Sequence, residues 1–257
     1  MSSSRSGTLL VALSAAAVAL LYLLSGPIAQ DPEYHRFADT REMLGVPNFW
    51  NVISNLPFLA VGVAGFAYVA RHPDATRSAI LRRAWLLLFA GMALTAFGSA
   101  YYHLAPGNRP LVWDRLPMTL GFAGLFAIVI GEFVSLRAAA TLLLPMLVAG
   151  AAAVLYWDFT ETRGFGDLRP YVVAQFLPVL LIPAILALYR GASDLGPAIW
   201  ALIGCYAVAK LFEHFDAGIY AGLGVVSGHT LKHLAAALAP TVLLLALRQR
   251  RQEARRG

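Results

Sequence analysis

The sequence predicts an all-α, polytopic membrane helix bundle, with a seven-helix core and one extra N-terminal transmembrane helix. Of the 257 residues, 59% are hydrophobic and only 13% are charged, whereas a soluble domain usually carries about 25% charged residues. The apolar residues form blocks of about 18–22, which is the length needed to cross about 30 Å of hydrocarbon. The shorter alternating segments that are typical of a transmembrane β-barrel do not occur.

The apolar blocks predict eight spans, at residues 8–26, 50–70, 80–103, 114–134, 138–156, 170–189, 196–214 and 228–247. The first block is longer than a typical secretory signal core, and Pro27-Ile28-Ala29 is a poor cleavage site, so we expect an uncleaved anchor. The chain then divides into an anchor with its outer loop (1–47), a seven-helix core (48–247) and a basic cytoplasmic tail (248–257).

The distribution of arginine predicts the orientation. Arginines lie in alternate loops and in the C-terminal segment, and the remaining loops carry charges of both signs. Because basic residues favour the cytoplasmic side, we expect both termini to lie inside. The net charge of +6 is therefore explained by topology and does not predict nucleic-acid binding. The single cysteine, Cys205, excludes a disulfide within the chain.

Polar and ionisable side chains inside predicted spans are costly, so they are candidates for function. Two pairs lie four residues apart, Ser99 with His103 and His229 with His233, so each pair shares one face of a helix. Asp114 follows at the predicted outer start of the next span. The topology brings all three segments to the same face of the membrane, where a bundle can join them just below the outer interface.

Two histidines on one helical turn and a third from another helix are a common way to bind zinc, with the fourth position left to water. We therefore predict His103, His229 and His233 as metal ligands. Asp114 is then the candidate general base or water-positioning group, and Ser99 the candidate donor to a developing oxyanion.

Other interpretations remain open for each residue taken singly. A histidine in a span is more often a packing or hydrogen-bonding residue, and a His-x-x-x-His pair also suits haem ligation. Ser99 could simply allow close helix contact, and Asp114 could pair with Arg115 at the interface. The combination of the segments favours a metal site.

The same pattern resembles the alkaline ceramidase family, part of a wider membrane-hydrolase group that includes adiponectin-receptor-like proteins. The resemblance is carried by Ser99, His103, Asp114, His229 and His233 with their spacing, and by the segment from Phe49 to Asn55. It covers about residues 48–247. It implies a seven-helix bundle in which the three histidines bind zinc, Asp114 activates water and Ser99 stabilises the oxyanion. The implied reaction is hydrolysis of the ceramide amide.

The chain departs from the eukaryotic pattern of that family in two ways. Asn48 stands where those members have a calcium-binding glutamate, and the nearby acidic residues Asp31, Glu33, Asp39 and Glu42 do not match the spacing. A Ca²⁺ site is therefore not expected. The extra N-terminal span is the second departure. Together these departures indicate a bacterial branch of the family. We therefore expect the site near the periplasmic face of the inner membrane, and the substrate can be a lipid amide other than ceramide.

Three further groups of residues have two interpretations each. Lys210, Glu213, His214 and Asp216 form either an ion-paired helix end or a site for a substrate headgroup. Asn51, Ser54 and Asn55 favour a hydrogen-bonded seam between helices over a catalytic element. Aromatic residues near the outer interface suit an aromatic belt, at Tyr101, Tyr102, Trp113 and Trp157.

The sequence thus predicts a zinc-dependent hydrolase that takes a lipid amide sideways from the bilayer. Membrane lipids are its expected surroundings, and nucleic acid is not an expected partner. Two alternatives belong to other classes: a receptor or sensor with structural zinc, similar to the adiponectin-receptor-like proteins, and a haem-binding membrane protein.

Overall fold

The computed structural model describes residues 3–256, which form the predicted all-α polytopic bundle. Seven helices are long and apolar enough to cross a membrane, and an eighth span results if the bent pair α8 and α9 counts as one. The long helices are α1 (Ser3–Leu24), α3 (Leu56–Arg71), α4 (Ala79–Leu104), α5 (Asn108–Val129), α6 (Leu136–Thr162), α7 (Arg169–Leu188), α8 (Gly196–His214) and α10 (Gly228–Ala254). These helices support an integral multi-pass membrane protein.

Short elements complete the chain. They are η1 (Pro32–His35), α2 (Phe49–Ile53), η2 (Pro73–Ala75), the π-helical turn η3 (Ile130–Val134) and α9 (Asp216–Leu223). Within residues 3–256, bridge pairing of the β type is confined to Met43 and Val46.

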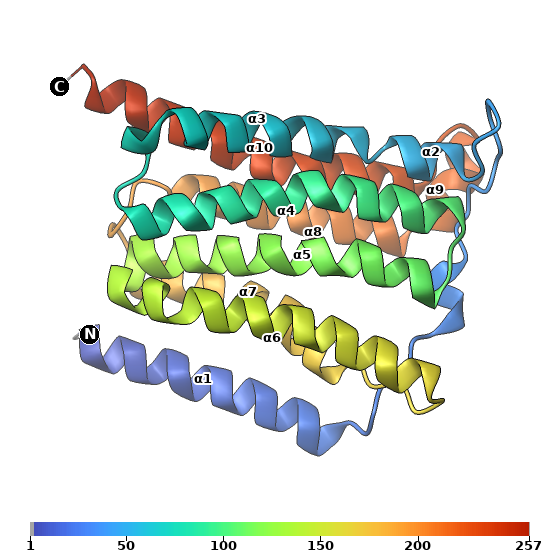
Figure 1. The fold of residues 1–257 in the computed structure, drawn as a ribbon, viewed down its shortest axis with the longest axis horizontal. Helices are drawn as coiled ribbons and strands as arrows, with labels where there is room; N and C mark the ends of the chain where they lie inside the picture. The colour runs from blue at the N-terminus through green and yellow to red at the C-terminus, as the bar shows by residue number, and fades with distance from the viewer. Residues whose placement is uncertain (1–2, 257) are drawn as a thin grey trace.

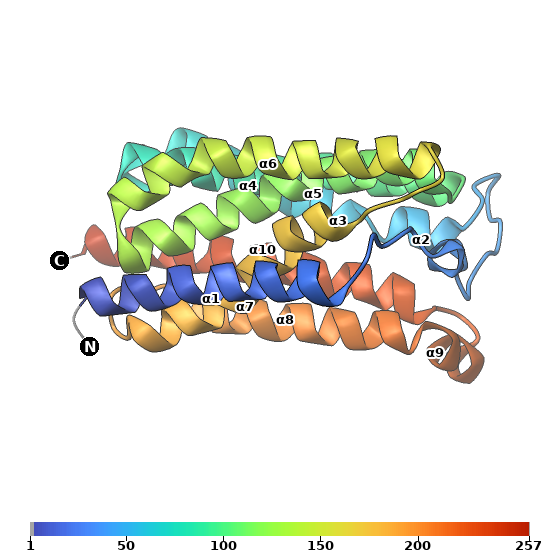
Figure 2. The same ribbon diagram turned by 90° about the horizontal axis from the view of Figure 1, so that it is seen from below.

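The two ends of the bundle differ in what they carry. Both chain termini lie at one end, which we call the terminal end (Figure 1). The opposite end, which we call the loop end, carries α2, α9 and the segment that joins α1 to α2 (Figures 1 and 2). An even number of crossings puts both termini on one side, so the arrangement agrees with the eight predicted spans.

Helix α1 lies at the edge of the bundle (Figure 1) and packs chiefly on α7. Its most apolar 18-residue stretch contains no buried residue. A helix that is apolar all round and unburied is suited to face lipid. The remaining seven spans share the main hydrophobic core, as expected for a seven-helix core with one added helix.

Three local features differ from the sequence-based expectations. Helix α5 begins at Asn108, before the expected position near residue 114, because Pro110 fits the first turn of a helix, where its missing N–H costs nothing. Residues 216–223, expected as loop, form α9, which is bent by 73° from α8. Tyr102 and Trp157 are 2% and 0% exposed, so they belong to the core and not to an aromatic belt.

Glycines set the distance between α4 and α5, the most extensive helix pair in the bundle. A Cβ atom added at Gly98 would overlap the carbonyl oxygen of Trp113, and one added at Gly91 would lie 2.6 Å from the backbone nitrogen of Gly121. Backbone approaches backbone at both points, as small residues permit at helix contacts in membranes. The contact at Gly98 lies directly beside Asp114.

We expect Gly98→Ala to destabilise the protein by about 1–3 kcal/mol, because the new methyl group has no space and must push two backbones apart. Thermal unfolding in detergent measures the effect. Gly204→Ala is the matched control, because a Cβ at Gly204 in α8 meets nothing within 4 Å. An unchanged unfolding temperature for Gly98→Ala would contradict this account of the α4–α5 contact.

A buried ion-pair network joins the helices at the terminal end. The Glu132 side chain is fully buried and accepts from Arg250 at 2.7 Å and from the Ser193 hydroxyl at 2.8 Å. Arg77 adds an ion pair to Glu132 at 3.3 Å. Hydrogen bonds from Arg250 hold the pKa of Asp194 below its usual range. The network connects η3, the α7–α8 loop and the end of α10, far along the bundle from the loop end.

Candidate metal centre

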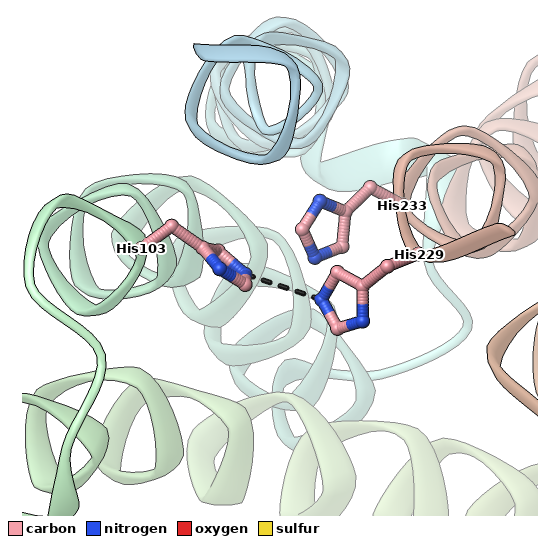
Figure 3. A group of neighbouring side chains, drawn as sticks. All are labelled: His103, His229 and His233. Atoms are coloured by element: carbon pink, nitrogen blue, oxygen red, sulfur yellow. Dashed lines mark hydrogen bonds between the residues drawn. The ribbon is translucent and has the colours of Figure 1, made fainter. Parts of the chain in front are cut away.

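Three buried histidines meet near the loop end of the bundle. His103 comes from the last turn of α4, and His229 and His233 come from the first turns of α10. Their side chains point toward one another across the gap between the two helices (Figure 3). Each offers one ring nitrogen to a group whose atoms all lie within 4.8 Å of one another. All three are nearly inaccessible to solvent, at 1%, 6% and 4% exposure.

The donor set fits a zinc ion. A tetrahedral zinc site has Zn–N distances of about 2.0–2.1 Å, so its ligand nitrogens lie about 3.3 Å apart. The Nε2 atoms of His103 and His229 are 3.2 Å apart. Three imidazoles occupy three positions of such a site and leave a fourth, as in catalytic zinc sites. The described residues could therefore hold a metal ion here, and the nitrogen ligands suit zinc.

Capping interactions fix the start of α10 and so the position of both of its histidines. Ser227 is the N-cap, and its hydroxyl accepts from the backbone N–H of Thr230 at 3.2 Å. The Asp216 carboxylate accepts from the backbone N–H of His229 at 2.7 Å and from that of Ala38 at 2.9 Å. The bonds from Thr230 and His229 satisfy N–H groups in the first turn of α10 that lack intrahelical partners. Asp216 thereby ties α9 and the loop before α2 to the metal centre.

Ser54 orients His233. The Ser54 hydroxyl lies 2.7 Å from Nδ1 of His233 and 3.3 Å from the backbone oxygen of Asn51. If Nε2 of His233 bound a metal, Nδ1 would carry the proton and donate to Ser54, whose hydroxyl donates in turn to the backbone oxygen of Asn51. Such outer hydrogen bonds fix the tautomer and ring orientation of a ligating histidine. The sequence predicted that Asn51, Ser54 and Asn55 form a hydrogen-bonded seam between helices, and Asn51 and Ser54 do bond to α10. It did not predict that Ser54 contacts one of the clustered histidines.

We expect Ser54→Ala to weaken zinc binding by about 10–100-fold, because the ring of His233 loses the partner that fixes its tautomer. Competition against a chelator of known zinc affinity measures the change. Thr241→Ala is the control. Thr241 lies on α10, the helix that carries His233, and its hydroxyl donates to the backbone oxygen of Ala237. Equal zinc affinity in wild type and Ser54→Ala would show that the contact does not tune the site.

Ser99 and Asp114, the two residues predicted to act beside the ligands, lie next to each other near the end of α4 that carries His103. Ser99 is one turn before His103 on α4 and is 4% exposed. Its hydroxyl forms a side-chain hydrogen bond with Asp114, which is half-buried on α5. The close approach at Gly98 brings Asp114 to this place. A carboxylate and a hydroxyl are thus held next to the ligand set without being part of it.

Arg115 does not serve as a simple ion-pair partner for Asp114. Its guanidinium lies 4.3 Å from the centre of the Trp157 ring and 4.8 Å from that of Tyr171. It also donates to the side-chain oxygen of Gln30 at 2.7 Å. Burial among aromatic faces stabilises the cation. These contacts fix the rotation of α5 about its axis, and therefore the direction of Asp114.

The loop between α1 and α2 covers the histidines. The Phe37 ring centre lies 4.7 Å from that of His103 and 4.4 Å from that of His229. Arg41 anchors the loop by two bonds to the Asp39 carboxylate, at 2.9 and 2.7 Å, and a third to the backbone oxygen of Val225 at 2.7 Å. Hydrogen bonds from Arg41 hold the pKa of Asp39 below its usual range. Asp39 therefore stays ionised at neutral pH and can keep its bonds to Arg41.

Sequence reasoning did not find Phe37 or the role of Asp216 at the metal centre. Both reach the site from irregular segments, which carry no periodic signal. No protein-family model matches the chain, and a search of curated proteins found no match.

Proposed function

We propose that the chain is a zinc-dependent membrane hydrolase that cleaves the amide bond of ceramide or a similar lipid amide and releases a fatty acid. The observation that carries this proposal is the buried cluster of His103, His229 and His233 with Asp114 and Ser99 beside it. The resemblance to alkaline ceramidases, residue by residue at these five positions, supports the choice of a lipid amide over other substrates.

The roles follow from the chemistry of each side chain. A bound zinc ion supplies Lewis acidity, which makes a water molecule reactive at neutral pH and polarises a carbonyl group. Asp114 is not one of the three metal ligands, so its carboxylate is free to accept the proton of the attacking water. Ser99 is a hydroxyl donor within reach of the same space and can stabilise negative charge on the carbonyl oxygen.

The surroundings support a substrate taken from the bilayer. The centre lies inside the bundle near one end, between helices that are long enough to span a membrane. An acyl chain can remain among apolar helix surfaces while its amide reaches the zinc. Arginines concentrate toward the terminal end, which supports a cytoplasmic terminal end and a periplasmic metal centre in a bacterial inner membrane.

Two alternatives remain as outcomes of the test. A haem between two of the histidines would have to accommodate the third imidazole and Phe37 within the space of its ring. This crowding argues against a haem protein. A receptor or sensor with structural zinc would have the same histidine cluster but would not hydrolyse a lipid amide. An activity assay distinguishes it from the proposed hydrolase.

The test is to measure metal content and lipid-amide hydrolysis on the same detergent-purified protein. We expect about one zinc per chain, fatty-acid release from a lipid amide, loss of release on chelation and recovery when zinc is restored. Zinc without hydrolysis of any amide tested would favour the sensor. Absence of zinc from protein prepared without chelators would reject the hydrolase mechanism.

A further inference from the structure

A charged cleft adjoins the metal centre at the loop end. It has a volume of about 420 Å³ and lies between the loop before α2, the end of α8 and the start of α9. The metal-binding histidine His229 and the covering residue Phe37 form part of its lining. Charged side chains of both signs form most of the remainder: Glu33, Arg36, Lys210, Glu213 and Asp216. A ligand in this cleft would therefore lie next to the metal.

The only two lysines of the chain meet at Glu213, which lines this cleft. The sequence has 20 lysines and arginines, of which only Lys210 and Lys232 are lysine. Both bind the same carboxylate: Lys232 lies 2.7 Å from Oε1 of Glu213, and Lys210 pairs with Oε2. Lys232 is three residues after His229 and one before His233, so it comes from the helical turn that supplies two metal ligands.

The balance of charge leaves Lys210 available. Glu213 has one negative charge and binds two ammonium groups, so the three groups together keep one positive charge that is not matched among them. The Lys210 side chain is 47% exposed and lines the cleft. A lysine ammonium has three N–H donors, so Lys210 can bind a further acceptor while it stays near Glu213.

The other acidic groups of the cleft have partners. Glu33 pairs with Arg36 at 3.0 Å. Asp216 accepts from the backbone N–H of His229 at the start of α10, at 2.7 Å, and from that of Ala38 in the loop before α2, at 2.9 Å. The lining carries three carboxylates and two cations, and Lys232 beside it makes the two charges equal in number. A divalent metal on the adjacent histidines would therefore leave the cleft and the metal centre net positive, since Asp114 supplies only one further negative charge.

We propose that this cleft binds an anionic oxygen group, a carboxylate or a phosphate, on the amine portion of the lipid amide, with Lys210 as its anion-binding residue and Lys232 as the residue that neutralises Glu213. This inference rests on the proposed function and narrows its substrate class. It favours lipid amides with an acidic headgroup, such as N-acyl amino acids or N-acylated phospholipids, over neutral ceramide. The acyl chain then lies on the bilayer side of the zinc and the headgroup on the cleft side.

Amine-directed labelling tests the proposal independently of turnover. The rate at which an acylating reagent modifies Lys210 is measured by mass spectrometry, with a lysine-containing peptide in the same tube as reference. The probes are N-oleoylglycine, hexadecyl phosphate and neutral N-oleoylethanolamine, in an uncharged detergent. We expect the preferred anionic probe to protect Lys210 from acylation at about tenfold lower concentration than the neutral probe. The reason is that a hydrogen bond between two charged groups is stronger than one to a neutral group.

The three probes distinguish the sources of the anion. Protection by N-oleoylglycine indicates a carboxylate headgroup, and protection by hexadecyl phosphate indicates a phosphate. Equal protection by charged and neutral probes, or none, would overturn the proposal. Because a carboxylate can also bind zinc, the measurement is repeated on metal-stripped protein, in which protection at Lys210 should persist.

Substitution at Lys210 provides the second measurement. In active protein, we expect Lys210→Gln to raise KM for an anionic amide about tenfold while KM for a neutral amide of equal acyl length stays the same. Lys210→Arg should restore most of the preference, since it keeps the charge. Loss of activity toward both amides would mean a structural role and reject the proposal. Anion protection in a protein without hydrolysis would instead retain the cleft and reject only the proposed reaction.

Discussion

We expect replacement of His103, His229 or His233 by alanine to abolish metal binding and to reduce the proposed lipid-amide hydrolysis below detection. Structural zinc sites contribute about 10–16 kcal/mol from four ligands, so the loss of one ligand lowers affinity by about 10²–10³-fold. The remaining two imidazoles cannot hold the ion through purification. Alanine at position 103 or 229 also leaves space beside Phe37, and alanine at position 233 leaves space beside Phe58, but the helices keep their long apolar contacts elsewhere.

Metal analysis beside a fatty-acid release assay measures both effects on one preparation. His72→Ala is the matched control, because His72 follows α3 at the other end of that span and lies outside the cluster. A similar size-exclusion profile for all variants shows that the bundle is intact. If any one of the three alanine variants kept both its zinc and its activity, that histidine would not be a ligand.

The spans could be predicted because the signal for them is local. An apolar run of sufficient length is a helix in a bilayer whatever its neighbours are, since no other structure satisfies its backbone groups. The exceptions have local causes of another kind. Helix α9 is only eight residues long and follows the bend after His214. Such a short segment is below the length at which periodicity separates helix from loop.

The ligand set could be predicted for a different reason. His229 and His233 share a face by spacing alone, and alternation of the spans brings His103 to the same end of the bundle. The residues that support the ligands could not be predicted so readily. Ser54 contacts His233 from 179 positions away in sequence, and Phe37 covers the rings from an irregular segment. Neither contact produces a regular spacing of residues that could be recognised in the sequence.

Helix phase accounts for the error in the aromatic belt. Tyr101 and Tyr102 are neighbours in sequence, yet one is 54% exposed and the other 2%. Tyr102 faces inward, where its hydroxyl lies 2.9 Å from Nδ1 of His35. The rotation of α4 that buries Tyr102 is set by the glycine contacts with α5. It therefore depends on two helices at once, which no single segment of sequence specifies.

We expect Asp114→Asn to keep its zinc and to lose turnover by about 10²–10⁴-fold, the usual contribution of a general base. Asparagine has the size of aspartate and can still bond with Ser99, so the α4–α5 contact at Gly98 should persist. It cannot accept a proton from water at neutral pH. The histidine cluster includes three ring nitrogens and no carboxylate, so metal content should not change.

The combination of the two results is what assigns the role of Asp114. Zinc content near that of wild type with a lowered kcat and an unchanged KM places the loss in the chemical step. Loss of zinc along with activity would instead make Asp114 a support for the ligands, acting through Ser99 and the last turn of α4. Full turnover in Asp114→Asn would show that another group accepts the proton, and the half-buried carboxylate beside the metal would then need a structural explanation.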